Sequence, residues 1–295
     1  MKRKLLALSS NPKQTIGRWD RLEAYWGVHV LDGDRFACHF GGSCRESHTG
    51  AFYEGQAHHI GRHFDLSIDG RPLRIVIVGQ EYGHPPAHVS LAARREMIVN
   101  GFGTQRRFFT EGRHASRNPH MRGTTSLLRL MLGKRLGSDY EGEFVLIGKE
   151  RVHIFECFAL VDFLLCSAVV GEQRTLDDGS VPKGGTRGAS TATMHRNCST
   201  HYRRAIEILE PTVIVAQGKG VRRWMDRVID RAEPAHSLLP IERVTIGSVE
   251  CYLLTFSHPA APTRENWGMN ERQPYLLETV APTIETWSTI LRHGL

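Results

Sequence analysis

VIVGQEYG, at residues 76–83, is an apolar run that ends abruptly in a loop carrying an ionisable side chain. A second run of the same kind, LTFSHPAA, lies at residues 254–261, near the other end of the chain. An open α/β sheet places its chemistry at the carboxyl ends of its strands. The two runs therefore bring a carboxylate and an imidazole to one sheet edge, which suggests an enzyme that handles developing charge in a cleft.

Strands and helices alternate along the chain. We predict buried strands at residues 73–78, 152–161 and 212–216, and a strand pair at residues 242–255. Helical spacing covers residues 88–99, 124–136, 198–209 and 272–292, and a further helix follows the turn at residues 217–220. This alternation implies a parallel sheet covered by helices on both faces.

The chain divides into an N-terminal segment and an α/β domain, which we expect to form one structural domain. Residues 1–70 are irregular in pattern, carry two of the cysteines and are expected to pack on the core, whereas residues 71–295 hold the strands and helices. Within the second part, residues 100–118 form a basic loop and residues 171–196 a long exposed loop.

The composition is that of a basic globular protein. Its 295 residues are 40% hydrophobic and contain no apolar run of about 18 residues, so a membrane span is excluded. A net charge of +7 favours a polyanionic partner, usually DNA or RNA, although a merely basic soluble protein would show the same balance. The apolar segment after the basic start is too short for a signal peptide, so we expect a cytoplasmic protein with free or metal-bound cysteines.

Several separate motifs occur in one order. GQEYGH at residues 79–84 follows the first strand, and a Pro-His pair at residues 119–120 opens the segment that ends in Leu127-Leu128. Asn197-Cys198 opens a helix, after which PTVIVAQG at residues 211–218 gives a proline, a strand and a glycine. HPAA at residues 258–261 comes last. In this order the motifs resemble the uracil-DNA glycosylase superfamily, especially its iron–sulfur branch, from about residue 38 to about residue 267.

The resemblance implies a three-layer αβα fold around a central, mostly parallel four-stranded sheet. It also implies an enzyme that flips a nucleotide out of DNA and cleaves its glycosidic bond. Glu81 would orient water and offset the positive charge on the sugar, and His258 would stabilise the departing base. The alternative to these catalytic roles is a structural one for each residue. Glu81 would cap a helix or form an ion pair, and His258 would be a loop histidine hydrogen-bonded to the backbone. No lysine stands at a matching strand end to form a Schiff base, so we expect a monofunctional enzyme that leaves an abasic site.

The residues expected to hold the base are Gln80, Tyr82, Gly83, His120 and Asp162. Asp162 stands where the family normally has asparagine. An ionised aspartate only accepts hydrogen bonds, but a neutral one could donate to N3 of cytosine and accept from its N4 amino group. Burial against the apolar residues 163–165 would raise its pKa in that direction. A neutral Asp162 could still bind uracil, and with a shifted alignment Asp162 would cap a turn and Glu156 would be the competing carboxylate.

Two further departures concern the shape of the base pocket. Gly83 falls where the best-known uracil enzymes have a tyrosine against the pyrimidine 5-position, and glycine leaves space for a substituent. His120 stands where phenylalanine usually stacks, and it can both stack and hydrogen-bond. The substrate we expect is a 5-substituted cytosine, including the hypermodified cytosines of some phage genomes, with a role in defence. A uracil glycosylase of base-excision repair and a non-catalytic iron–sulfur DNA-binding module are the alternatives, and a metal-dependent nuclease lacks a carboxylate cluster.

The cysteines agree with the iron–sulfur branch. Four thiols from distant segments suit a 4Fe–4S cluster, and the ligands would be Cys38, Cys44, Cys166 and Cys198. The branch usually has a tighter first pair than the five-residue gap here. Tetrahedral zinc is the second candidate, and four ordinary buried thiols are the third. Cys157 and Cys251 lie in strand-like runs and are expected in the core.

The basic residues expected to contact DNA phosphates lie in loops that would flank the cleft. They are Arg106, Arg107, Arg113, Arg117, Lys183, Arg187 and Arg264. Trp267 or Arg264 would act as the wedge that fills the space left by the base, unless Trp267 anchors its loop in the core. DNA is therefore the expected partner of a monomeric protein.

Overall fold

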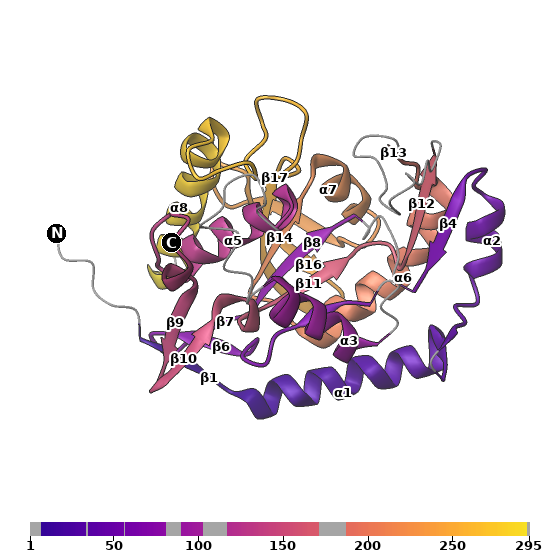
Figure 1. Cartoon of the computed structure of the whole chain (residues 1–295), viewed down its shortest axis with the longest axis horizontal. Helices are drawn as coiled ribbons and strands as arrows, with labels where there is room; N and C mark the ends of the chain where they lie inside the picture. The colour runs from indigo at the N-terminus through magenta and orange to yellow at the C-terminus, as the bar shows by residue number, and fades with distance from the viewer. Residues whose placement is uncertain are drawn as a thin grey trace, which may run out of the picture.

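The fold is a mixed α/β structure around one central sheet (Figure 1). A computed structural model of the chain describes residues 7–33, 35–55, 57–80, 90–102, 117–170 and 187–293. The central sheet has seven strands in the order β15-β16-β17-β14-β8-β11-β5. Their bounds are β5 His59–Ile60, β8 Ile75–Gly79, β11 Phe158–Asp162, β14 Val213–Gln217, β15 Arg231–Pro234, β16 Ile241–Ile246 and β17 Val249–Phe256.

Four neighbouring strands of this sheet, β17, β14, β8 and β11, run parallel to one another. The mostly parallel central sheet is thus confirmed, but it is wider than the four strands expected. Three antiparallel strands extend it: β16 and β15 beyond β17, and β5 beyond β11. The sequence missed β5 because two residues are too short to show a period.

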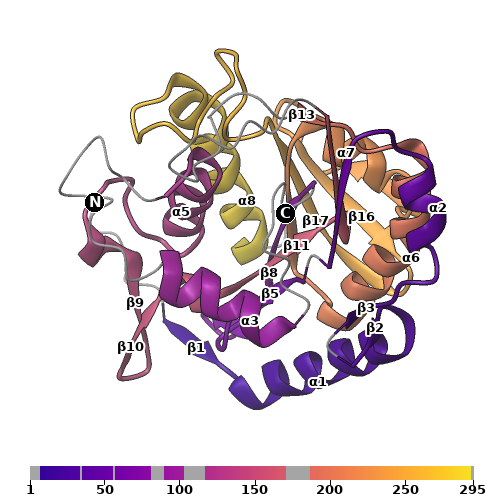
Figure 2. The same ribbon diagram turned by 45° about the vertical axis from the view of Figure 1, so that its right-hand side comes forward.

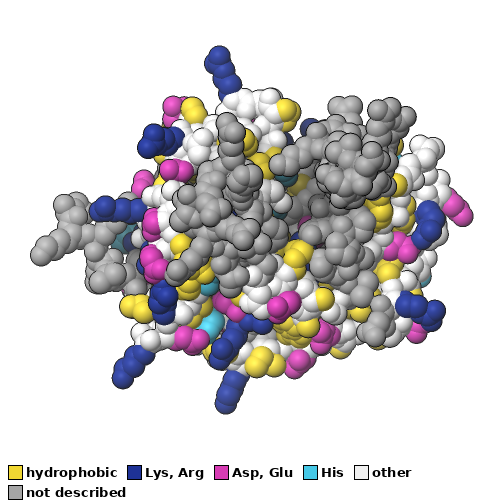
Figure 3. Space-filling model, in the orientation of Figure 1, with side chains coloured by type: hydrophobic (Ala, Val, Ile, Leu, Met, Phe, Trp, Pro, Cys, Tyr) yellow, Lys and Arg dark blue, Asp and Glu magenta, His cyan; other side chains and the backbone are white. Residues whose placement is uncertain are grey.

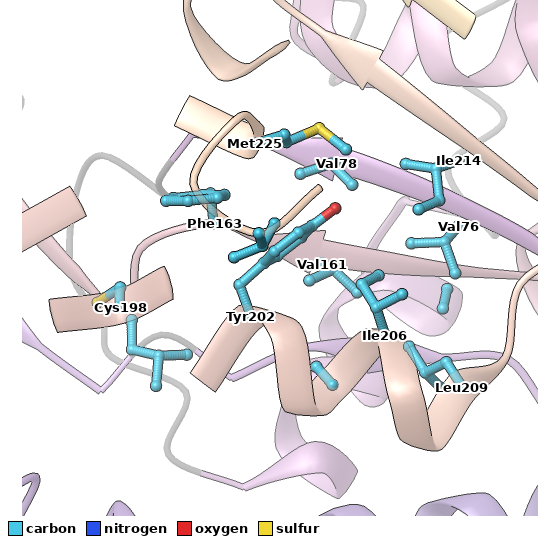
Figure 4. Close-up of a cluster of buried hydrophobic side chains, with 14 of the residues drawn as sticks. Val76, Val78, Val161, Phe163, Cys198, Tyr202, Ile206, Leu209, Ile214 and Met225 are labelled. Atoms are coloured by element: carbon cyan, nitrogen blue, oxygen red, sulfur yellow. The ribbon is translucent and has the colours of Figure 1, made fainter. Parts of the chain in front are cut away.

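The parallel strands are buried on both faces, as their continuous apolar sequence predicts. In β8, Ile75 and Ile77 face one core with the helices α5 (Pro119–Met131) and α8 (Ala281–His293). Val76 and Val78 face the other core with α1 (Pro12–His29), α6 (Ala192–Leu209) and α7 (Lys219–Met225). Figure 2 shows these helices on opposite sides of the sheet. Figure 4 shows side chains of α6, including Tyr202 and Ile206, against β8 and its neighbours. The layers are therefore helix, sheet and helix.

The principal helices are well capped. Asn118 caps α5 through its side chain, with Pro119 at the first helical position, and Thr191 caps α6. The helices are α1 Pro12–His29, α2 Gly41–Glu46, α3 Leu91–Glu96, α5 Pro119–Met131, α6 Ala192–Leu209, α7 Lys219–Met225 and α8 Ala281–His293. Shorter or π-type turns are η1 Met97–Phe102, η3 Tyr140–Glu143, η4 Ile154–Glu156 and η5 Leu276–Val280.

The N-terminal segment contains more regular structure than its sequence suggested. Helix α1 is 18 residues long and buries Leu22 and Trp26 against the α6 side of the core. Arg18 in the same helix is buried too and binds Asp65 at 3.0 Å. The apolar stripe of α1 is narrow and includes a charged residue, so its period was not evident in the sequence.

Four small sheets complete the fold. They comprise β1 Leu8–Ser10 with β6 Leu66–Ile68 and β7 Arg71–Leu73; β4 Ala51–Glu54 with β12 Cys166–Val170 and β13 Arg187–Gly188; β2 Leu31–Asp32 with β3 Arg35–Phe36; and β9 Phe144–Ile147 with β10 Glu150–His153. The strand predicted at residues 152–161 is divided by η4 into the end of β10 and the start of β11. Among the helices the structure describes, none is long and apolar enough to cross a membrane.

Candidate functional site

The carboxyl ends of the four parallel strands meet at one edge of the sheet. Asp162, the last residue of β11, pairs with Gly79, the last residue of β8. Gln217 at the end of β14 pairs with Phe256, the last residue of β17, so the Ser257-His258 loop leaves at the same edge. The N-terminus of α5 also reaches this edge, since the ring of His120 stacks on that of His258, with centroids 5.5 Å apart and planes 17° from parallel.

The structure thus brings His120, Asp162 and His258 to one edge, and Gln80 follows β8 there. Glu81, Tyr82 and Gly83 lie outside the described residues. The alternative carboxylate, Glu156, lies in η4, before the start of β11, and is paired with Arg95. Because β11 ends at Asp162, Glu156 stands at the opposite end of this strand from the site.

Asp162 is a buried acid with a buried basic partner. Its exposed fraction is 4%, and Arg94 of α3 places Nη2 3.4 Å from its Oδ2. Burial raises the pKa of Asp162 to about 6, and the charge of Arg94 opposes that rise. The direction agrees with the sequence prediction. Arg94 itself was missed, because a basic residue on an amphipathic helix gives no signal that it is turned inward.

Gly79 lies close to two polar atoms from different segments. A β-carbon at Gly79 would stand 3.4 Å from Oδ1 of Asp162 and 3.8 Å from Nε2 of His120, so both atoms border the same point above the strand end. Burial, together with the nearby charges of His258 and Arg94, lowers the pKa of His120 to about 3, although a hydrogen bond with Gln217 acts in the opposite direction. His120 is therefore neutral at physiological pH.

His258 presents one hydrogen-bond donor. Its Nδ1 accepts from the backbone N–H of Ala260 at 3.1 Å, so in the neutral ring the proton is on Nε2. His258 is exposed to solvent, but the atoms packed around it still desolvate the ring and lower its pKa below the ordinary value. The hydrogen bond from Ala260 N to Nδ1 is the backbone bond that an ordinary loop histidine would also make. Here the same bond selects the tautomer that carries its proton on Nε2.

The loop after β17, which begins with Ser257, His258 and Pro259 and is called the His-Pro loop below, is fixed by close packing. Gly268 N donates to Pro259 O at 2.8 Å, and Trp267 Nε1 donates to Ser257 O at 2.8 Å. Trp267 is completely buried in the core with α5 and α8. The prediction of Trp267 as a DNA wedge is therefore wrong, and the alternative that it anchors the loop is correct. Arg264, in the same loop, is exposed.

Gln80, the residue after β8, is held by two hydrogen bonds. Its Nε2 donates to Ser190 Oγ at 2.9 Å, and its backbone oxygen accepts from Leu164 N at 2.9 Å. Ser190 also contacts Nε2 of His195 at 3.0 Å, and the ring of His195 lies on Trp224 with centroids 3.7 Å apart. Sequence analysis identified neither Ser190 nor His195, which lie where the 171–196 loop runs into α6.

The residues predicted to bind phosphates are only partly described. Arg117 is completely buried and binds both oxygens of Glu143, at 2.7 and 2.8 Å, so its prediction as a DNA contact is wrong. Arg106, Arg107, Arg113 and Lys183 lie outside the described residues, as does the side chain of Arg187, whose backbone forms part of β13. In Figure 3 the basic side chains of the described surface are interspersed with acidic ones.

The four cysteines predicted as ligands lie in one region, on the α6 side of the sheet. Cys44 in α2, Cys166 in β12 and Cys198 in α6 are buried in the same core, and Cys38 is partly exposed. Burial raises the pKa of Cys166 well above its usual range, and the Cys198, Cys44 and Cys38 thiols each add to the rise. Such mutual influence requires that the four thiols be near one another.

No single-ion site is formed by the described residues, because none of their groups of three or more His, Cys, Asp and Glu side chains could hold a metal ion. The iron–sulfur and zinc predictions therefore stay predictions. A zinc ion would draw its sulfurs to about 2.3 Å from one centre. A 4Fe–4S cluster places iron and sulfide between its four thiolates, so its ligands need not meet at one centre. Cys157 and Cys251 are buried, as predicted.

A cavity of about 170 Å³ lies beside this edge rather than at it. It is bordered by α5 and the loop after Trp267, including Arg122, Thr125, Met269 and Glu271. Arg122 crosses it to donate to Met269 O at 2.7 Å. The cavity does not include His120, Asp162 or His258.

Comparison with protein-family models finds no match for this chain, and comparison with curated proteins finds none either.

Proposed function

We propose that the chain is a monofunctional DNA glycosylase that flips out a modified pyrimidine, cleaves its glycosidic bond and leaves an abasic site. The observation that carries the proposal is the approach of Asp162 Oδ1 and His120 Nε2 to one point beside Gly79, with His258 stacked on His120. An acid that can read a base edge, at the end of β11, and a neutral imidazole that can donate, in the loop after β17, thus lie at the same edge of the sheet. The motif order and the four parallel strands, like those of the uracil-DNA glycosylase superfamily, also support it.

Cleavage of a glycosidic bond builds positive charge on the sugar and negative charge on the base. The Nε2–H of neutral His258 would donate to the departing base, where a fixed donor stabilises developing charge without reorganising. Glu81, next along the chain after Gln80, would take the role that the resemblance gives it, orienting water and offsetting the charge on the sugar. No lysine is assigned a covalent role, so the product would be an abasic site.

The preferred base is a 5-substituted cytosine, including hypermodified forms of the phage type. A neutral Asp162 donates to N3 and accepts from the N4 amino group, and its pKa of about 6 keeps about a tenth of it neutral at pH 7. A bound base would replace water around the acid and raise that fraction. Excision of such a base would serve antiviral defence.

A specific observation favours uracil as the second candidate. Arg94 lies 3.4 Å from Asp162 and stabilises its ionised form. An ionised Asp162 accepts a hydrogen bond from N3–H of uracil and repels N3 of cytosine, which carries no proton. The alternative is therefore a uracil-DNA glycosylase of base-excision repair.

The cofactor we propose is a 4Fe–4S cluster bound by Cys38, Cys44, Cys166 and Cys198, with zinc as the alternative. The cluster would join four segments of the chain: the loop after β3, α2, β12 and α6. Its contribution when bound would be to fix these segments beside the sheet. A non-catalytic iron–sulfur DNA-binding module remains the alternative of another class.

The proposal is tested by incubating the purified protein with duplexes that carry one uracil, cytosine, 5-hydroxymethylcytosine or glucosylated 5-hydroxymethylcytosine. Alkali then breaks each strand that has lost its base. Breaks confined to the modified cytosines support the proposal. Rapid breaks at uracil alone would contradict the modified-cytosine proposal and favour a uracil-DNA glycosylase of repair. DNA binding without breaks in any duplex would favour the non-catalytic module.

A further inference from the structure

Helix α6 carries two polar side chains that reach the sulfurs of other cysteines. Asn197 Nδ2 lies 3.3 Å from Cys44 Sγ, and His201 Nε2 lies 3.4 Å from Cys38 Sγ. Both flank Cys198, one position before it and three after it, on the same helix. The helix that supplies one proposed ligand therefore also contacts the sulfurs of two others.

His201 is held on its other side by a tyrosine. Its Nδ1 lies 2.8 Å from the hydroxyl of Tyr25, which belongs to α1. The exposed fraction of His201 is 2%, so water does not compete for these contacts. The chain of atoms Tyr25 Oη, His201 Nδ1, His201 Nε2 and Cys38 Sγ thus links three separate segments of the protein.

The hydrogens of this chain can point in two directions. In one, the Tyr25 hydroxyl donates to Nδ1 and Nε2–H donates to the sulfur of Cys38. In the other, the thiol donates to Nε2 and Nδ1–H donates to the hydroxyl of Tyr25. A free thiol can join either arrangement, but a metal-bound thiolate has no proton and can only accept. Ligation of Cys38 therefore selects the first direction, in which every donor has an acceptor.

We infer that His201 is a positioning residue for the proposed metal centre, donating from Nε2 to the sulfur of Cys38 while Tyr25 fixes its tautomer. The inference depends on the cofactor proposed above. A hydrogen bond to a ligand sulfur offsets the negative charge that a cluster gains on reduction, so it makes the reduction potential more positive. Outer hydrogen bonds also orient the ligand and slow loss of the metal.

The test uses the full chain purified without oxygen, as wild type and as the variants His201→Phe, His201→Gln and Tyr25→Phe. Iron and sulfide per chain, the reduction midpoint and the rate of iron loss to a chelator are measured. His201→Phe should lose iron about 10–100-fold faster and have a more negative midpoint. His201→Gln, which keeps a donor, should lie closer to wild type. Tyr25→Phe, which removes a single oxygen, should change both quantities in the same direction but less.

The outcomes separate this inference from the proposed function. Iron in the wild type, with unchanged midpoint and iron loss in both Tyr25→Phe and His201→Phe, would overturn the role of His201 and leave the cofactor standing. Should His201→Phe fail to fold, Tyr25→Phe decides alone. Wild-type protein without iron would overturn the inference together with the cofactor. Base release from the duplex panel is measured separately, so either result leaves the glycosylase proposal to its own test.

Discussion

We propose that Asp162 determines which base is released. It is a buried carboxyl at the end of a central strand, and Arg94 and the loss of water act on its pKa in opposite directions. The neutral form fits the edge of cytosine and the ionised form fits N3–H of uracil. The protonation of one side chain would therefore determine which base is released.

The pH dependence of base release follows from this pKa. Burial raises the folded-state pKa of Asp162 to about 6, so the neutral form grows as pH falls from 8 towards 6. Release of a modified cytosine should rise over that interval, whereas release of uracil by ionised Asp162 should fall. Asp162→Asn, with no proton to gain, should lose the rise and prefer uracil by at least about tenfold. Single-turnover rates from pH 5.5 to 8.5 measure this, and parallel profiles for both proteins would refute the role of Asp162.

Gly79 offers a test that leaves the fold intact. In Gly79→Ala the new carbon would make ordinary contacts of 3.4 Å with Asp162 Oδ1 and 3.8 Å with His120 Nε2, so the melting temperature should change little. The methyl group would nevertheless occupy the point beside Asp162 Oδ1 and His120 Nε2 where the proposed base edge would bind. Base release should fall at least about tenfold while duplex affinity stays within about twofold. Unchanged release would show that the base binds elsewhere.

At the scale of elements, two glycines determine how closely α5 approaches the His-Pro loop. A β-carbon on Gly268 would lie 1.9 Å from the backbone oxygen of Pro119, and one on Gly123 would lie 2.7 Å from Pro259. Both values are shorter than real contacts, so only glycine allows the approach. This approach brings the first turn of α5, with His120, against the loop that carries His258.

Gly123→Ala should separate these two elements. Alanine normally favours a helix over glycine by about 1 kcal/mol, but here its methyl group would push Pro259 and Trp267 away. We expect slower base release and a lower melting temperature. The matched control is Gly27→Ala in α1, where no atom lies within 4 Å of the new carbon, and this variant should be slightly more stable. If both variants behaved alike, the close approach would have no effect on the site.

The sequence predicted the elements better than their inward-facing polar residues. The apolar runs located β8, β14 and β17, the strand-end argument placed His258 at the sheet edge, and the family resemblance singled out Asp162. It did not reveal Arg94, because its inward direction depends on the packing of α3 against the sheet. Arg117 was assigned to DNA for the same reason, since a buried arginine and a surface arginine look alike in a sequence. Trp267 could be either wedge or anchor until the fold placed it in the core.

At the scale of the whole molecule, a buried ion pair joins the start of α5 to η3 and β10. Arg117, just before α5, binds Glu143 in η3, and His153 of β10 donates to the same carboxylate at 2.9 Å. Burial raises the pKa of Glu143, but the hydrogen bonds from His153 and Arg117 outweigh it and hold the pKa below its ordinary value. This stability is present above the unfolded pKa and is lost as pH falls through the folded one.

Removing one partner of this pair should be costly. Arg117→Met leaves the Glu143 charge buried without its arginine partner, so the free energy of unfolding should fall by about 3–5 kcal/mol. The control is Arg35→Met, whose partner Asp32 lies at 3.2 Å on the surface, and it should cost about 0–1 kcal/mol. Urea unfolding at pH 7 measures both. Equal losses of unfolding free energy in the two variants would mean that the buried Arg117–Glu143 pair does not stabilise the fold more than a surface pair.

The central claim is that this chain splits a flipped nucleoside at its sugar, with His258 donating to the departing base. The most direct measurement is mass spectrometry of the free base released in a single turnover from a duplex with one glucosylated 5-hydroxymethylcytosine. We predict one intact modified base and one abasic site per duplex, with His258→Ala about 10²–10³-fold slower at unchanged duplex affinity. Strand cleavage without a free base, or equal release by wild type and His258→Ala, would contradict the account.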